Sequence, residues 1–265
     1  MKNLLEGGMR FAFPPYMVNF SGQWPLIKIK SRAKNGKRLL SCVYYNIVSI
    51  YGLRNSYWEF SRRTMTPQRL RQLFSKLPPL KSSLGRGIPA AVLIPLFYEG
   101  PELMMLFTQR TYLVKHHRGQ ISFPGGVHDS TDDNLLTTAL RESQEEIGLA
   151  PEKVDILGFL NSTLTITGFL VHSFVGLIPY PYEFRLNVRE VARLLSFPVR
   201  ELLRPHRWRT GPHEWEGKRT TVYYCQMPET TIWGATARIL VDFLAVLDPS
   251  FEPAAIPEAT FRITS

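Results

Sequence analysis

One stretch of the chain, residues 122–149, constrains both fold and chemistry more than any other. It ends in the pattern Arg-Glu-X-X-Glu-Glu-X-Gly at residues 141–148. On a helix, side chains three and four positions apart share one face, so Glu142, Glu145 and Glu146 would project together. Three carboxylates on one face repel each other unless a cation lies between them, and Mg²⁺ and Mn²⁺ prefer carboxylate oxygens. The pattern therefore indicates either a metal site or a solvated acidic face.

The residues around this pattern predict where the helix begins and ends. We expect a helix over residues 134–147, capped at its start by Asp132 or Asp133 and at its end by Gly148 in a left-handed conformation. Residues 124–126, a proline followed by two glycines, predict a tight turn in which the backbone approaches a ligand without interference from a Cβ atom. Turn, loop and helix together form one coherent unit.

This order of features resembles the Nudix box, the signature of hydrolases that split a diphosphate linked to another group. The resemblance implies a mixed β-sheet sandwiched between α-helices, an α/β/α arrangement. It also implies a divalent cation, Mg²⁺ or Mn²⁺, held by Glu142, Glu145 and Glu146 with help from the Gly126 carbonyl. The residues with predicted catalytic roles are Glu142, Glu145 and Arg141. Among these, Arg141 is expected to orient the loop by pairing with a box carboxylate.

A second element lies just before the box and resembles the one that marks the coenzyme A diphosphatase branch of the Nudix family. The matching positions are Leu106, Thr108, Arg110, Gly119 and 123–126, whereas Phe107, Thr111 and Lys115 depart from the pattern. The box is one residue longer than the general pattern and has aspartates near the usual mid-box glutamate, which also resembles this branch. The predicted reaction is hydrolysis of coenzyme A or its thioesters to 3′,5′-ADP and 4′-phosphopantetheine or its acyl form.

Basic residues before the box are the predicted phosphate contacts, because guanidinium and ammonium groups bind phosphate oxygens. Lys115 keeps a positive charge but lacks the planar fork of an arginine. The predicted substrate-binding residues are Arg110, Lys115, Gly125 and Gly126. His116 and His117 fit a phosphate contact and a solvated loop equally well.

The general base is not assigned by the sequence. Glu142 is one candidate, and Glu214 and Glu216 are others, because Nudix enzymes often place this group on a loop outside the box. A solvated loop explains Glu214 and Glu216 as well.

The positive charge of the chain is concentrated at its beginning. Residues 1–64 hold 11 Lys and Arg against two Glu, a net +9 out of the +10 of the whole chain, which leaves +1 for residues 65–265. Nucleic acid is therefore not the expected partner of the main domain. Two alternatives stay open: a Nudix hydrolase for another diphosphate such as ADP-ribose or NADH, and a noncatalytic Nudix module that binds nucleic acid through the basic segment.

The basic residues 1–64 are expected to be an N-terminal extension, which fits a small appended β element, a poorly ordered arm or sequence not native to the mature protein. Residues 65–265 are expected to form a Nudix domain, because the resemblance covers about residues 85–245. A helix capped by Thr66 is predicted to open the domain, followed by a β-hairpin over residues 91–110. Two cysteines suit a reducing compartment, and no apolar run of about 18 residues is present, so the expectation is a cytoplasmic protein without a membrane span. A small-molecule substrate is the expected partner, and a homodimer is compatible with the sequence.

Overall fold

The computed structural model describes residues 65–77, 87–113, 118–215 and 217–253, which all fall within one compact unit spanning residues 54–265. The predicted N-terminal extension lies outside these residues. So do three residues of the basic cluster, Lys115, His116 and His117, and one candidate base, Glu216.

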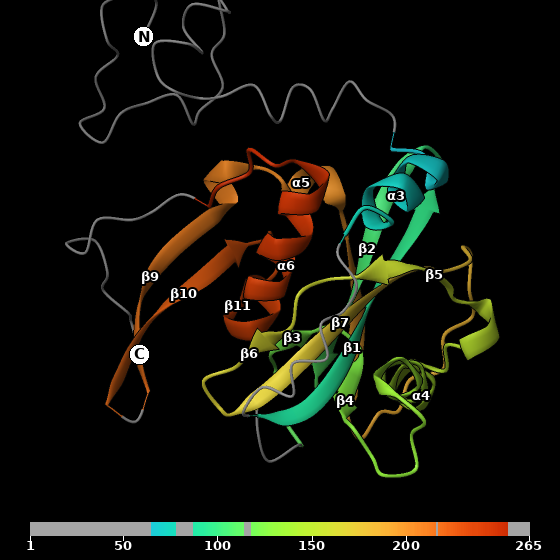
Figure 1. Ribbon diagram of the computed structural model, residues 1–265, viewed down its shortest axis with the longest axis horizontal. Coiled ribbons are helices and arrows are strands. Elements are labelled where there is room, and N and C mark those ends of the chain that lie inside the picture. The colour runs from blue at the N-terminus through green and yellow to red at the C-terminus, as the bar shows by residue number, and fades with distance from the viewer. Residues whose placement is uncertain (1–64, 78–86, 114–117, 216, 254–265) are drawn as a thin grey trace, which may run out of the picture. The chain divides into compact units, whose positions relative to one another are not determined.

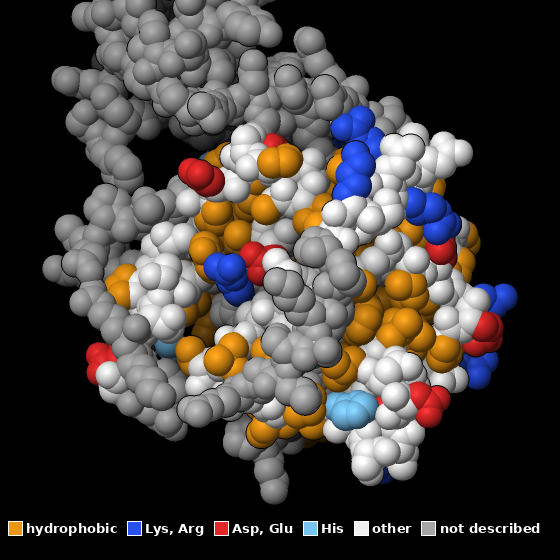
Figure 2. Space-filling view, viewed as in Figure 1, with side chains coloured by type: hydrophobic (Ala, Val, Ile, Leu, Met, Phe, Trp, Pro, Cys, Tyr) orange, Lys and Arg blue, Asp and Glu red, His pale blue; other side chains and the backbone are white. Residues whose placement is uncertain are grey.

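The first helix of the described chain, α3, covers Pro67–Phe74. Thr66 caps it, because its side-chain oxygen accepts a hydrogen bond from the Arg69 amide at 3.3 Å, as predicted. Its buried residues are Leu70 and Phe74. The opposite face is basic, and Figure 2 shows Lys and Arg side chains over the region of this helix.

The predicted hairpin is confirmed. Strand β1, Ile88–Glu99, pairs antiparallel with β2, Glu102–Arg110, and the two are joined by a turn at Gly100. The turn requires a positive φ of 58° there, which glycine adopts without strain. Strand β1 begins three residues earlier than predicted and is buried on both faces along most of its length.

These two strands belong to an eight-stranded mixed sheet with the central order β3-β2-β1-β7-β5. The pairing of β1 with β7 is parallel, and the other pairings are antiparallel. Strand β4 extends the sheet beside β1, β6 beside β7 and β8 beside β2. The remaining strands of the sheet are β3 (Ile121–Ser122), β4 (Gly125–Val127), β5 (Asp155–Phe159), β6 (Thr163–Leu164), β7 (Phe169–Leu177) and β8 (Val191–Pro198).

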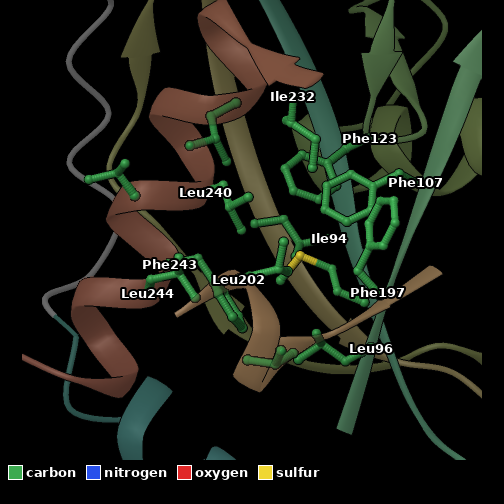
Figure 3. Close-up of a cluster of buried hydrophobic side chains, with 14 of the residues drawn as sticks. Ile94, Leu96, Phe107, Phe123, Phe197, Leu202, Ile232, Leu240, Phe243 and Leu244 are labelled. Atoms are coloured by element: carbon green, nitrogen blue, oxygen red, sulfur yellow. The ribbon is translucent and has the colours of Figure 1, made fainter. Parts of the chain in front are cut away.

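Helices cover both faces of this sheet, which confirms the predicted α/β/α arrangement (Figure 1). Alternate residues of β1 point to opposite faces: Ile94 and Leu96 join the core under α6 (Gly234–Leu247), whereas Leu93 joins the core under α4 (Leu135–Ile147). Figure 3 shows the α6 side, where Leu240, Phe243 and Leu244 of the helix pack toward residues of the sheet.

The chain beyond β8 forms a short helix α5 (Val199–Leu202) and a second sheet of three antiparallel strands. These strands are β9 (Trp208–Trp215), β10 (Lys218–Gln226) and β11 (Thr231–Trp233), and single 3₁₀ turns occur at Pro151–Lys153 and Pro205–Arg207. The alternative interpretation of Glu214 as part of a solvated loop is wrong, because Glu214 lies on β9, where it pairs with Arg219 of β10.

Candidate active site

Two glycines place backbone directly under the acidic helix. Gly125 and Gly126 belong to β4, which pairs with residues 90–92 of β1. A Cβ atom on Gly125 would lie 2.3 Å from the Ala91 carbonyl oxygen, and one on Gly126 would lie 2.4 Å from the carboxyl carbon of Glu142. Gly125 has no room for a side chain because backbone atoms of β1 fill that space, whereas a Cβ atom at Gly126 would displace the Glu142 carboxylate that lies against it.

The acidic helix α4 covers Leu135–Ile147 and ends as predicted at Gly148, whose φ of 69° is left-handed. The predicted start was wrong. Asn134 is the N-cap, since its side-chain oxygen accepts a hydrogen bond from the Thr137 amide at 3.0 Å. Asp133 is exposed, and Asp132 is buried and committed to a different interaction.

That interaction is an ion pair that ties the box loop to the helix. Arg141 donates to both carboxylate oxygens of Asp132, at 2.9 and 3.1 Å, and also contacts Glu142 and Glu145 at 3.0 Å each. The hydroxyl of Thr138 donates to Asp132 at 2.8 Å. The guanidinium holds the pKa of the buried Asp132 carboxyl well below its usual range. Arg141 therefore orients the box carboxylates through charge-assisted hydrogen bonds.

The three glutamates of the pattern differ in environment. The Glu146 side chain is 4% exposed, that of Glu142 is 17% exposed and that of Glu145 is 57% exposed. Glu146 accepts a hydrogen bond from the Gly125 amide at 3.4 Å, and Glu142 lies against Gly126. Glu142 and Glu146 thus converge on the glycine strand, whereas Glu145 lies at the surface beside Arg141.

Burial raises the pKa of Glu146 to about 8, because the charged form loses its hydration and the positive charge of Arg110 only partly compensates. Burial also raises the pKa of Glu142, opposed by Arg141. The ionised forms of these two carboxylates are therefore destabilised in the fold, and a bound cation would stabilise them.

Arg110, at the end of β2, is a basic residue next to Glu146. Its terminal nitrogen lies 3.7 Å from a Glu146 carboxylate oxygen, and its buried Nε atom has no hydrogen-bond partner. The unused Nε–H donor of this partly buried guanidinium is suited to donate to a further oxygen, such as that of a phosphate. Of the two basic residues predicted to bind phosphate, Arg110 lies beside Glu146, and Lys115 lies outside the described residues.

Sequence reasoning missed a fourth carboxylate, Glu190. It lies in the segment between β7 and β8. The Asn187 amide donates a hydrogen bond of 2.9 Å to the Glu146 carbonyl and so joins this segment to the end of α4. Its negative charge raises the pKa of both Glu142 and Glu146. No motif spacing connects Glu190 to the box, since tertiary packing alone brings it there.

The candidate base Glu214 is placed elsewhere. It is exposed on β9 of the three-stranded sheet. The segment joined to the box helix by hydrogen bonds is residues 178–190, through the amides of Arg185 and Asn187 and the carbonyls of Ile147 and Glu146.

A divalent cation fits this arrangement by the chemistry of its donors. Across the described ranges, no three acidic, histidine or cysteine side chains form a closed metal cage. Mg²⁺ does not need one, because it is usually held by one or two carboxylates, several waters and the substrate phosphates. The pair of Glu142 and Glu146, whose negative charge the neighbouring arginines only partly compensate, meets that requirement.

Comparisons with known proteins indicate a family. A family profile described as "NUDIX domain" matches residues 87–215. The chain is 35% identical over 179 residues to a protein named "Uncharacterized Nudix hydrolase NudL" of Cronobacter sakazakii, covering 66% of this chain and 93% of the relative. A protein of the same name from Pectobacterium atrosepticum is 37% identical over 165 residues, covering 62% of this chain and 85% of the relative.

Solved structures with similarity to this chain include a MutT/nudix family protein from Enterococcus faecalis, with a TM-score of 0.41, 16% identity and 74% of each chain covered. An Ap4A hydrolase of C. elegans has a TM-score of 0.37 and 18% identity, covering 42% of this chain and 80% of the other.

The fold and the box define a hydrolase that acts on pyrophosphate bonds. The chain belongs to the Nudix hydrolase family, whose members generally depend on a divalent metal. In the part of the chain that the structure describes, no helix is long and apolar enough to cross a membrane.

Proposed function

We propose that the chain hydrolyses the diphosphate of coenzyme A or its thioesters, releasing 3′,5′-ADP and 4′-phosphopantetheine or its acyl form. The observation that carries this proposal is the element before the box, in which Leu106, Thr108, Arg110 and Gly119 precede the FPGG turn. Arg110, the charged residue of that element, lies beside Glu146, so the element and the box contribute to one site.

Arg110 is the proposed ligand of a substrate phosphate oxygen, since its Nε is buried without a hydrogen-bond partner. Lys115 is proposed as a further phosphate contact from its place in the same element, although it lies outside the described residues. Gly125 and Gly126 are proposed to contribute to substrate binding through their backbone, which lies directly beside the carboxylates of Glu146 and Glu142.

The proposed metal ligands are Glu142, Glu145 and Glu146. A bound Mg²⁺ or Mn²⁺ would neutralise phosphate charge and lower the pKa of a coordinated water. Arg141 holds Glu142 and Glu145 in position by ion pairs, and that is its proposed role in catalysis. Glu145 contributes from the surface side of the group, where its carboxylate is most accessible.

The proposed general base is Glu190 or Glu142. Glu190 accepts a hydrogen bond from the side-chain amide of Asn187 at 3.2 Å, which orients its carboxylate. Glu142 is held by Arg141, which partly opposes the rise in its pKa that burial causes. Glu190 is the preferred candidate for accepting the proton of the attacking water, because Glu142 is already a proposed metal ligand.

We also propose that residues 65–265 form the catalytic domain and that residues 1–64 are dispensable for hydrolysis. A chain that starts at Met65 should keep kcat/KM within about threefold of the full chain. Loss of all hydrolysis in a shortened chain that still folds, measured by circular dichroism, would show that the extension takes part in the reaction.

The decisive experiment compares coenzyme A, ADP-ribose and NADH as substrates of the full chain, each with Mg²⁺ and with Mn²⁺, with products separated by chromatography. The proposal expects 3′,5′-ADP from coenzyme A and a higher kcat/KM than for the other two. Preference for ADP-ribose or NADH would leave a Nudix diphosphatase but reject the coenzyme A assignment. Salt-sensitive RNA binding without hydrolysis of any of the three would favour the binding-module alternative instead.

Glu146→Gln tests the catalytic role of the box in the same assay. We expect kcat to fall by a factor of at least about 10³, because removal of a carboxylate that binds metal weakens charge neutralisation in the transition state. The matched control is Glu152→Gln, an exposed glutamate just after the helix, which should leave kcat unchanged. Near-normal turnover by Glu146→Gln would exclude Glu146 as a metal ligand.

A further inference from the structure

Arg110 ends strand β2 at an irregularity in the sheet. Strands β2 and β8 pair in step as far as Gln109 and Arg193. Arg110 then pairs with Val191, so β8 contributes one extra residue at this point. A bulge of this kind beside a site sets the direction of a side chain, and the Arg110 guanidinium lies 3.7 Å from Glu146. The groups that hold this bulge therefore bear on the position of Arg110.

The side chain of Gln109 joins β8 to the chain just before β3. Its oxygen accepts a hydrogen bond from Arg193 Nε at 2.6 Å, and its nitrogen donates to the Gly119 carbonyl at 3.1 Å. A guanidinium only donates and a carbonyl only accepts, so these two partners fix which way the Gln109 amide faces. Arg193 therefore holds Gln109 in the orientation in which it can donate to Gly119.

The next carbonyl along the chain is bound to Arg110 itself. The Arg110 amide donates to the Gln120 carbonyl at 2.9 Å. Two consecutive residues of β2, Gln109 and Arg110, are thus bound to two consecutive carbonyls, those of Gly119 and Gln120. Because both bonds join the same two pieces of chain, a shift of the Gly119 carbonyl is transmitted to the backbone of Arg110.

A carboxylate from the other sheet is the third member of this polar chain. Glu229, in the turn between β10 and β11, accepts a hydrogen bond from Arg193 Nη1 at 3.2 Å. The side chains of Arg193 and Glu229 are 46% and 66% exposed, so their ion pair contributes little to the stability of the fold. Its effect is to orient the Arg193 guanidinium, whose Nε then faces Gln109. The contribution of Arg193 is therefore expected in the geometry of the site.

We propose that Gln109 and Arg193 are positioning residues of the active site, which act through the backbone of residues 119–120 to hold Arg110 in place for a substrate phosphate. This inference rests on the proposed function, in which Arg110 is a phosphate ligand. A displaced phosphate ligand weakens the binding of substrate and of transition state alike, so KM rises while kcat is kept. Loss of one such hydrogen bond raises KM by about two- to tenfold.

The test measures kcat and KM of the full chain for coenzyme A. Arg193→Met and Gln109→Met remove the hydrogen bonds with little change of side-chain length, and each should raise KM about two- to tenfold while kcat changes by less than about twofold. Arg193→Lys keeps a donor at this place and should restore most of the wild-type KM. The control is Arg200→Met, which removes an exposed arginine paired with Glu102 at the other end of β2 and should leave KM unchanged.

A combined variant tests whether the effect passes through Arg110. In an Arg110→Gln background, Gln109→Met should raise KM no further, because the two residues act as one unit. The dissociation constant of coenzyme A, measured by calorimetry in a chelator so that no turnover occurs, should follow the same pattern. Equal effects of Gln109→Met in both backgrounds would overturn the inference.

A wild-type KM in both Arg193→Met and Gln109→Met, or a fall in their kcat alone, would also overturn the inference while the proposed function stands. Hydrolysis of ADP-ribose but not of coenzyme A by wild type would reject the proposed function, and the same variants measured with ADP-ribose then decide the inference. The two failures are therefore distinguishable. Circular dichroism of each variant ensures that KM is compared between folded proteins.

Discussion

Replacement of Glu146 by glutamine should stabilise the metal-free protein at alkaline pH even as it abolishes activity. The wild-type carboxyl has an ordinary pKa of 4.5 in the unfolded chain and a pKa of about 8 in the fold, mainly because it is buried. Glutamine has nearly the same shape but never ionises. The variant therefore avoids the cost of burying a charge, which the wild type bears in order to have a carboxylate at this position.

The sign and the size of the effect follow from the linkage between protonation and folding. Below pH 4.5 the carboxyl is neutral in both states, so wild type and Glu146→Gln should unfold alike. As the pH rises from 4.5 toward 8, the unfolded chain releases a proton that the folded chain retains, and wild type loses stability. At 1.36 kcal/mol for each tenfold change in proton affinity, the total cost is about 5 kcal/mol. Arg110 loses an anionic partner in the variant, which reduces the expected gain to about 2–4 kcal/mol.

The assay is urea unfolding at pH 4.5 and at pH 8.5 in the presence of a chelator, followed by a repeat with saturating Mg²⁺. The midpoint of Glu146→Gln should exceed that of wild type at pH 8.5 but not at pH 4.5. Mg²⁺ should raise the wild-type midpoint and have much less effect on the variant, since the ion binds the carboxylate of the folded state. The exposed control Glu152→Gln should follow wild type throughout. A variant that is no more stable than wild type at pH 8.5 would refute the conclusion that the buried Glu146 carboxylate destabilises the fold at that pH.

Other substitutions probe the groups around this carboxylate. Asp132→Ala removes both carboxylate oxygens that accept hydrogen bonds from Arg141 and should lower the free energy of unfolding by about 2–3 kcal/mol in urea titrations. The control Asp133→Ala changes an exposed neighbour and should alter the free energy of unfolding by less than about 0.5 kcal/mol. Equal effects of the two substitutions would show that the buried ion pair does not stabilise the fold. Gly126→Ala places a Cβ atom 2.4 Å from the Glu142 carboxyl carbon and should reduce kcat/KM at least tenfold in the coenzyme A assay, and wild-type activity would mean that the carboxylate position is unimportant. Glu190→Gln should lower kcat by about 10²–10⁴ while circular dichroism shows that the fold is kept; near-normal kcat would exclude Glu190 as the general base.

The sequence by itself determined the local units of this protein. Residues 141–148 fix three carboxylates on one helix, because helical spacing depends only on the chain. Gly148 fixes the end of that helix and Gly100 the turn of the first hairpin, since both positions need a left-handed backbone conformation. The fold class followed from the same pattern together with its resemblance to the Nudix box.

Tertiary structure decided which side chains act together. Glu145 and Glu146 are neighbours in the sequence, yet one is at the surface with Arg141 and the other is buried against Gly125, because a helix turns adjacent residues toward different surroundings. Asp132 could be read as a helix cap from its position, but a guanidinium nine residues later competes for it with two charge-assisted hydrogen bonds.

Glu190 is the clearest case of a residue brought to the site by packing alone. It lies 44 residues beyond Glu146 in the sequence, a separation without a periodicity that a sequence pattern could detect. Its segment is held by hydrogen bonds from the amides of Asn187 and Thr111 to the carbonyls of Glu146 and Glu190, and such backbone groups are common to nearly every residue. Side-chain identity therefore predicted the chemistry of the box, while backbone contacts between distant segments decided what surrounds it.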